Sequence, residues 1–148
     1  MGDRNPLPYE TTLLVRDNCL CLHVQRAARS LARRYDAAFK PFGLNNGQFS
    51  LLMSLNRPEP PAMGAVAGLL SMDRTTLTAA LKPLERRGLV ASAPDAADRR
   101  SRRLKITDAG RALLAQAMPA WHATQAETAR LIAEEAPNRL RADLRALS

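Results

Sequence analysis

The fold is decided by residues 71–110, which are SMDRTTLTAALKPLERRGLVASAPDAADRRSRRLKITDAG. After the tight connection at residues 71–73, apolar residues recur at helical spacing and predict a helix over residues 74–87. Gly88 ends this predicted helix, because glycine tolerates the left-handed backbone found at helix termini. The positions predicted to face inward are Leu77, Leu81 and Leu84.

Two short strands and a charged hairpin follow this helix. Residues 89–93 and 102–106 are predicted to pair as strands, with an Asp/Arg-rich hairpin tip between them. Thr107 then caps a helix that begins at residue 108 and runs past Trp121, with a kink at Pro119. Pro83 should bend the preceding helix, which we still expect to continue because the leucine spacing continues across it.

Three more helices are predicted upstream of residue 71. One runs from about Thr12 to Phe42, and Gly43 follows it as a left-handed cap. A second follows Asn45, since an asparagine oxygen can accept a free backbone N–H at a helix start. A third, short helix covers residues 63–70 and has only Ala62 at its capping position.

The long first helix carries an apolar stripe that needs another surface to cover it. A last helix, predicted over residues 137–147, is also patterned with apolar residues. Neither helix has another partner in the chain, so the sequence predicts a homodimer. The residues of the first helix's stripe are Leu20, Val24, Leu31, Tyr35 and Phe39.

Composition favours a helical chain whose positive charge is concentrated in one segment, which suits either a polyanion or a solvated, arginine-rich surface. Of 148 residues, 46% are hydrophobic and only 4% aromatic, and the formal net charge is +8. The segment from Arg74 to Lys105 holds nine Lys/Arg and three acidic residues, and such concentrated positive charge suits a polyanion. No apolar run approaches the roughly 18 residues of a membrane span, and the start MGDRNPLPYE lacks the apolar core of a signal peptide. We therefore expect a cytoplasmic protein with no membrane partner.

Two short helices joined by a three-residue turn and followed by a basic hairpin form a winged helix-turn-helix. The predicted fold class is therefore mainly α with a small β wing. The second helix of such a pair can enter the DNA major groove, where its N-terminal residues reach base edges. The hairpin can lay arginine side chains along phosphates or into the minor groove. Double-stranded DNA is the predicted partner.

The same region resembles the MarR family of regulators. The matching stretches are Met72–Thr78, Leu84–Val90, Asp95–Arg100 and Leu104–Gly110. The resemblance extends from about Asn18 to the last helix and implies an obligate homodimer. The implied organisation is a single MarR-like chain, 1–148, with a winged helix-turn-helix lobe at 45–107 and dimerisation helices at 10–42 and 108–148.

The resemblance also implies roles for individual residues. Those that would face the major groove are Arg74, Thr75, Thr76 and Thr78, with Lys82 reaching a phosphate. Arg100 would enter the minor groove, held by Asp98 two residues earlier. Support for backbone contact would come from Arg99, Arg102 and Arg103. The threonines could instead be ordinary helix surface, and Arg102 and Arg103 could face solvent, since adjacent strand residues point to opposite faces.

The two cysteines, Cys19 and Cys21, suggest a signal. On one continuous helix they would point about 200° apart and could not form a disulfide without unwinding. The peroxide-sensing OhrR branch of the family resembles residues 18–22, which implies that Cys21 is a reactive thiol and that Tyr35 helps hold it across the dimer. Two alternatives stay open: both cysteines are structural, or the effector is a small aromatic or lipophilic ligand bound between the dimerisation helices and the DNA lobe.

The residues do not suggest catalysis. His23 and His122 are the only histidines, and no Gly-rich phosphate loop or triad-like set is present. We therefore predict that the chain is not an enzyme and uses no cofactor or metal. A non-enzymatic scaffold for protein partners is the competing class. We expect a repressor, but the sequence does not specify whether binding represses or activates, nor the operator, target genes and effector.

Overall fold

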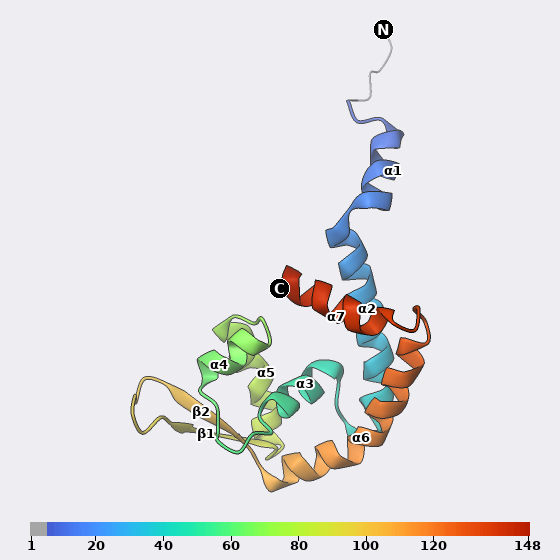
Figure 1. Ribbon diagram of the computed structural model, residues 1–148. Helices are drawn as coiled ribbons and strands as arrows, with labels where there is room; N and C mark the ends of the chain where they lie inside the picture. Colours follow the sequence, from blue (N-terminus) through green and yellow to red (C-terminus); the bar gives the residue numbers. More distant parts are fainter. Residues whose placement is uncertain (1–5) are drawn as a thin grey trace. The chain divides into compact units, whose positions relative to one another are not determined.

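The computed structural model describes residues 6–148. The expectation that MGDRNPLPYE is not a signal peptide rests partly on residues 1–5, which lie outside the described residues. The chain divides inside its second helix into two compact units, the first ending at Arg34 and the second running from Tyr35 to Ser148. The elements, in chain order, are α1 (Tyr9–Asn18), α2 (Leu20–Phe39), the 3-10 helix η1 (Lys40–Phe42), α3 (Asn46–Ser54), α4 (Met63–Leu69), α5 (Arg74–Arg86), β1 (Val90–Pro94), β2 (Arg102–Ile106), α6 (Asp108–Ala129) and α7 (Ala136–Leu147) (Figure 1).

The predicted single helix over residues 12–42 is wrong, because the helix is interrupted at Cys19. This residue has an extended backbone, with φ −73° and ψ 108°. The Asn18 side chain donates to the Leu14 carbonyl oxygen at 2.8 Å and closes α1. The Cys19 Sγ then accepts from the backbone N–H of Leu22 at 3.4 Å, as a cap at the start of α2. The backbone bonds from the Cys19 N–H to the Val15 carbonyl and from the His23 N–H to the Cys19 carbonyl remain, at 2.9 and 3.1 Å. The thiol takes the Leu22 N–H, which a continuous helix would pair with the Asn18 carbonyl.

The helices of the second unit begin and end largely as local chemistry dictates. Gly43, with φ 65°, follows η1 as the predicted left-handed residue. Asn45 caps α3 through a capping box in which its side chain accepts from the Gln48 N–H and the Gln48 side chain accepts from the Asn45 N–H. Ala62 makes no side-chain cap, as expected, and Gly88 follows α5 with φ 69°.

Helices α4 and α5 meet at a tight turn. The N–H groups of Ser71 and Met72 donate back to the Gly68 and Ala67 carbonyls at 3.2 and 2.9 Å and close α4. Ser71 takes φ 51°, a left-handed conformation that is uncommon for a residue with a side chain. The turn is therefore constrained by the backbone, and it sets the position at which α5 begins.

Strands β1 and β2 form the two-stranded antiparallel wing (Figure 1). Val90 pairs with Ile106 at its base and Pro94 with Arg102 near its tip. The first strand begins one residue later than predicted, whereas the second has the predicted bounds. A β-bridge between Ala62 and Arg103 adds the segment before α4 to the outer edge of the sheet.

The core of the second unit joins the wing to the helices. The Phe39 and Phe49 rings stack with centroids 4.2 Å apart. The predicted inward face of α5 is confirmed, and Leu104 and Ile106 of β2 are also buried. Further core residues include Leu51, Leu52, Leu55, Val66, Leu77, Leu81, Leu84 and Leu114. This burial fixes the faces of α5 and the wing that remain exposed.

Candidate nucleic-acid interface

The N-terminus of α5 is ordered by Asp73. Its carboxylate accepts from the Thr76 backbone N–H at 2.7 Å and from the Thr76 hydroxyl at 2.9 Å. These two bonds hold the pKa of Asp73 below its ordinary value. The cap fixes the first turn of the helix, which is the part of a recognition helix that reaches base edges.

The exposed face of α5 carries the residues predicted to contact the major groove. Arg74, Thr75, Thr76, Thr78 and Lys82 are all exposed. The hydroxyls of Thr76 and Thr78 donate within the helix, the latter to the Arg74 carbonyl at 2.8 Å. Arg74 lies at the positive end of the helix dipole, where a cation is disfavoured unless an anion approaches. The arrangement is chemically suited to a phosphate-bearing partner.

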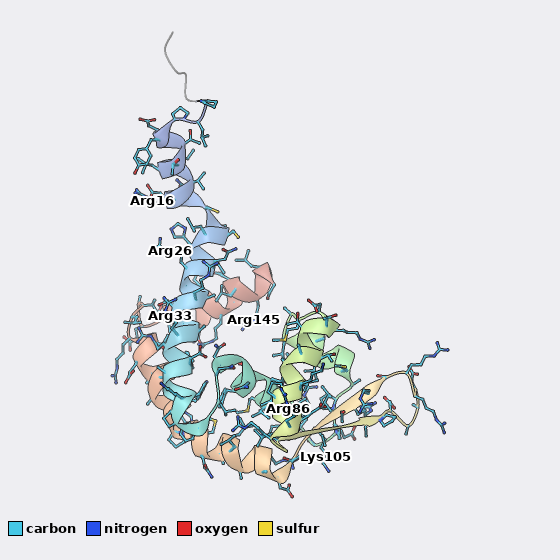
Figure 2. The ribbon with its side chains drawn as sticks, turned by 180° about the vertical axis from the view of Figure 1, so that it is seen from behind. Arg16, Arg26, Arg33, Arg86, Lys105 and Arg145 are labelled. Carbon is cyan, nitrogen blue, oxygen red and sulfur yellow. The ribbon has the colours of Figure 1, made fainter. Side chains whose placement is uncertain are left out.

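The wing tip presents Arg99 and Arg100 to solvent, and long side chains extend from this end of the hairpin (Figure 2). Asp98 accepts a hydrogen bond from the backbone N–H of Arg100 at 3.0 Å. We predicted that Asp98 holds the Arg100 side chain. The structure instead shows the Asp98 carboxylate bonded to the Arg100 backbone, so it orders the loop rather than the guanidinium. A backbone contact of this kind is typical of Asx turns.

Arg102 and Arg103 point to different partners on the wing. The Arg102 Nη2 donates to the Ser92 Oγ at 2.7 Å. The Arg103 Nε donates to the Asp95 carboxylate at 3.0 Å and its Nη1 to the Pro60 carbonyl at 2.8 Å. Both arginines therefore make contacts within the lobe, which the strand pattern alone did not indicate.

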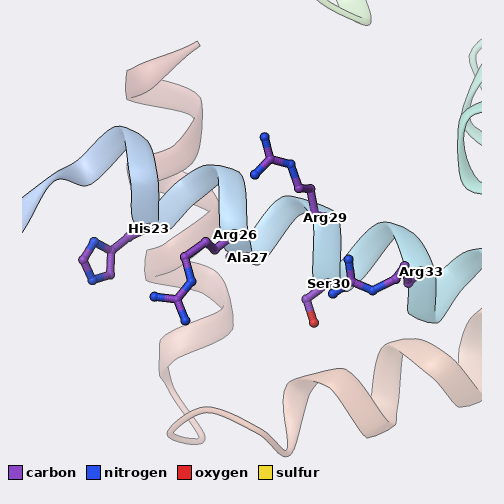
Figure 3. A pocket seen from close by; sticks show the side chains of 6 residues that line it. All are labelled: His23, Arg26, Ala27, Arg29, Ser30 and Arg33. Carbon is purple, nitrogen blue, oxygen red and sulfur yellow. The ribbon is translucent and has the colours of Figure 1, made fainter. Parts of the chain in front are cut away.

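A second basic surface lies on α2. Arg26, Arg29 and Arg33 line a shallow depression of about 540 Å³ together with His23 (Figure 3). All four side chains are exposed to solvent. A charged helix face of this kind is commonly solvated. Unlike α5, this part of α2 is not part of a helix-turn-helix followed by a basic hairpin.

The cysteines are not equivalent. Cys19 is half-buried and Cys21 exposed, and the Cys21 Sγ accepts from the Gln25 side-chain amide at 3.2 Å. Since Cys19 lies outside the regular helix, the angle of about 200° expected between the two side chains does not apply. Tyr35 donates its hydroxyl to the Gln125 side-chain carbonyl oxygen of the same chain at 2.6 Å.

An apolar pocket of about 560 Å³ lies among α3, α4 and α6 of the second unit. Its lining is mostly apolar, with Phe49 and Met53 from α3, Leu69 from α4, and Met118 and Trp121 from α6. Such a volume suits a small, largely apolar molecule.

Comparison with known proteins identifies the family. The model of the MarR family matches residues 44–101, from just before α3 to the wing tip. The M. tuberculosis transcriptional regulator MosR, solved in complex with DNA, is 38% identical, with 88% of this chain and 93% of that chain covered and a TM-score of 0.79. The chain belongs to the MarR family.

Curated MarR-type relatives include both an activator and a repressor of transcription. The activatory protein BadR of Rhodopseudomonas palustris is 34% identical over 97 residues, which cover 64% of this chain and 55% of BadR. The repressor MprA of Escherichia coli K12 is 29% identical over 117 residues, which cover 78% of this chain and 63% of MprA. The match thus spans little more than half the length of these MarR-type relatives.

In the described part of the chain, no helix combines the length and apolarity that crossing a membrane requires.

Sequence reasoning missed three residues of this MarR lobe. Asp73 immediately precedes a predicted helix, a position that signals an N-cap and could have identified it. Asp95 and Pro60, the partners of Arg103, gave no comparable signal. Pro60 is 43 residues from Arg103 along the chain, and only the tertiary fold brings them together.

Proposed function

We propose that this chain is a transcriptional repressor that binds a pseudo-palindromic operator as a homodimer. The observation that carries the proposal is the pairing of two exposed basic surfaces in one lobe, residues 45–107. On α5, Arg74 and the neighbouring threonines would contact the major groove, and Lys82 a phosphate. On the wing, Arg99 and Arg100 would contact phosphates and the minor groove.

Dimerisation would use the helices outside this lobe, residues 10–42 and 108–148. Both units expose large apolar side chains, which water would surround in a single chain and a partner subunit would cover in a dimer. In the first unit these include Tyr9, Leu14, Val15 and Leu20, and in the second Leu131, Ile132, Leu140, Leu144 and Leu147. Exposed apolar side chains repeated along a helix are typical of an interaction site, and a second copy of the chain would cover those of each unit symmetrically. Sedimentation at micromolar concentration tests the proposal, and a stable, folded monomer would contradict it.

The symmetry of a dimer sets the geometry of the operator. Two recognition helices that enter successive major grooves on one face of DNA require half-sites about one helical turn, roughly 10 bp, apart. Genomic DNA captured by the protein and then footprinted should show two related half-sites at that spacing. Protection of one asymmetric half-site would contradict the dimeric arrangement.

Thiol oxidation at Cys21 is the first candidate signal. Cys21 is exposed in the single chain, and its sulfur accepts from the Gln25 side-chain amide. A hydroperoxide can oxidise such a thiol to a sulfenic acid. Tyr35 follows Cys21 by fourteen residues. Fourteen residues of α-helix rise about 21 Å, so the two side chains can act together only if they come from different subunits. Oxidation would add bulk and polarity at the dimer seam and shift the distance between the two recognition helices.

A small aromatic or lipophilic effector is the alternative signal, and the apolar pocket favours it. Because the pocket lies between α3 and α4, a bound molecule could alter how the helix-turn-helix is held. Trp121 lines the pocket and is the single tryptophan of the chain, so its fluorescence reports occupancy. A small aromatic molecule that changes Trp121 emission and releases operator DNA, in a Cys21→Ser protein, would establish this signal over the thiol.

A further inference from the structure

Arg103 lies where the wing meets the segment before α4. It is on β2, and its Nε and Nη1 donate to two different segments, the Asp95 carboxylate at 3.0 Å and the Pro60 carbonyl at 2.8 Å. The Asp95 side chain is only 11% exposed, whereas that of Arg103 is 45% exposed. The guanidinium therefore connects a covered carboxylate at the start of the hairpin tip to the chain before α4.

Both partners of Arg103 are themselves held in place. The other Asp95 oxygen accepts from the Ala97 N–H at 2.9 Å, and the Asp95 N–H donates to the Ser101 carbonyl at 2.9 Å. These bonds close the loop that carries Arg99 and Arg100. At the other end, the Leu104 N–H donates to the Pro61 carbonyl at 2.9 Å, next to the Ala62–Arg103 bridge.

We infer that Arg103 is a positioning residue, whose guanidinium holds the hairpin tip against the segment before α4 and so aims Arg99 and Arg100 at DNA. The inference rests on the proposed function for its DNA readout. It also separates Arg103 from the phosphate contacts with which sequence reasoning grouped it. The planar fork of arginine can reach two acceptors at fixed angles, and a lysine ammonium at the same place cannot.

Two substitutions distinguish positioning from direct DNA contact. Arg103→Lys keeps the positive charge, so a phosphate contact would survive while the two-acceptor bridge would not. Asp95→Asn removes a negative charge from a surface proposed to face DNA, so simple electrostatics predicts tighter binding. The asparagine side chain would keep an oxygen for the Ala97 N–H but present an NH₂ group to Arg103, so loss of positioning predicts weaker binding.

The experiment measures operator affinity of these variants over a salt series, with Arg86→Lys, at an exposed arginine of α5 that has no assigned DNA contact, as the matched control. We expect Arg103→Lys and Asp95→Asn each to weaken binding about tenfold, with the salt slope unchanged and the double variant no weaker than either single one. Arg86→Lys keeps the charge of an exposed side chain and should bind like the wild type. Wild-type affinity for Arg103→Lys, or tighter binding by Asp95→Asn, would overturn the inference.

Hydrogen exchange in the DNA-free protein tests the same inference independently of DNA binding. The Leu104 amide reports whether β2 stays bonded to Pro61, and it should exchange about tenfold faster in Arg103→Lys but not in Arg86→Lys. Unchanged exchange in Arg103→Lys would overturn the positioning role. If the wild type bound no DNA at all, the proposed function would fail while this measurement would still decide the role of Arg103.

Discussion

Replacing Gly110 by alanine should destabilise the fold, although alanine normally favours helices. Gly110 lies in the first turn of α6, against the base of the wing. A Cβ there would lie 2.4 Å from the Leu89 carbonyl oxygen and 2.7 Å from the Ile106 Cγ1. Alanine gains about 1 kcal/mol over glycine from helix propensity, whereas overpacking against a backbone atom costs about 1–3 kcal/mol or more. Since the obstructing atom is backbone oxygen, we expect the upper part of that range and a net loss of about 2 kcal/mol.

Gly68→Ala in α4 is the matched control, because no atom beyond the adjacent residues and the local helix backbone lies within 4 Å of the Cβ it would add. The same substitution should there stabilise by up to about 1 kcal/mol. At about 3 °C per kcal/mol for a chain of this size, thermal unfolding should shift down by about 6 °C for Gly110→Ala and up by about 3 °C for Gly68→Ala. Equal or greater stability of Gly110→Ala would refute the close approach of α6 to Leu89.

Three other predictions follow from the DNA lobe and the thiols. Arg100→Ala should weaken operator binding about tenfold and lower the salt slope. Asp98→Ala should also weaken operator binding, because it releases the loop backbone that carries Arg100. Wild-type affinity of Asp98→Ala in anisotropy titrations would refute this effect of the loop backbone. In the folded protein the pKa of Asp73 lies below its ordinary value of 3.8. The stabilisation by the ionised cap is therefore fully present above pH 3.8, and it is lost as pH falls through the folded pKa. The stability advantage of wild type over Asp73→Ala should therefore be constant above about pH 5 and shrink below pH 4 in urea titrations, and an advantage that does not shrink would exclude this titration. A stoichiometric organic hydroperoxide should release DNA from wild type and Cys19→Ser but not from Cys21→Ser, and unchanged wild-type binding with a free thiol by mass spectrometry would leave the ligand alternative standing.

Features with a local chemical cause were predictable from the sequence. The Asn45 cap, the left-handed Gly43 and Gly88 and the bounds of β2 each depend on a few adjacent residues. Helix α5 continues through Pro83 as expected, because the burial of its leucines offsets one lost backbone bond.

The features that escaped prediction have competing or distant causes. The interruption at Cys19 occurs without proline or glycine, in a stretch whose composition suits a helix, and depends on the side chains of Asn18 and Cys19. The contacts of Arg103 join residues far apart in sequence, and strand alternation predicted only that Arg102 and Arg103 differ in direction. The roles of the DNA-contacting residues came from the resemblance to the MarR family, and they stay predictions.

The salt dependence of DNA binding tests the central claim most directly. If Arg74, Lys82, Arg99 and Arg100 of both subunits bring about eight positive charges against the DNA and displace its condensed counterions, log K should fall linearly with log salt concentration at a slope of about −7. Anisotropy titrations of a labelled duplex between about 50 and 200 mM salt give that slope, and over this range the affinity should fall by about 10⁴. Absence of binding to any duplex at the lowest salt, or a slope near zero, would contradict the DNA-binding role and favour a scaffold for protein partners.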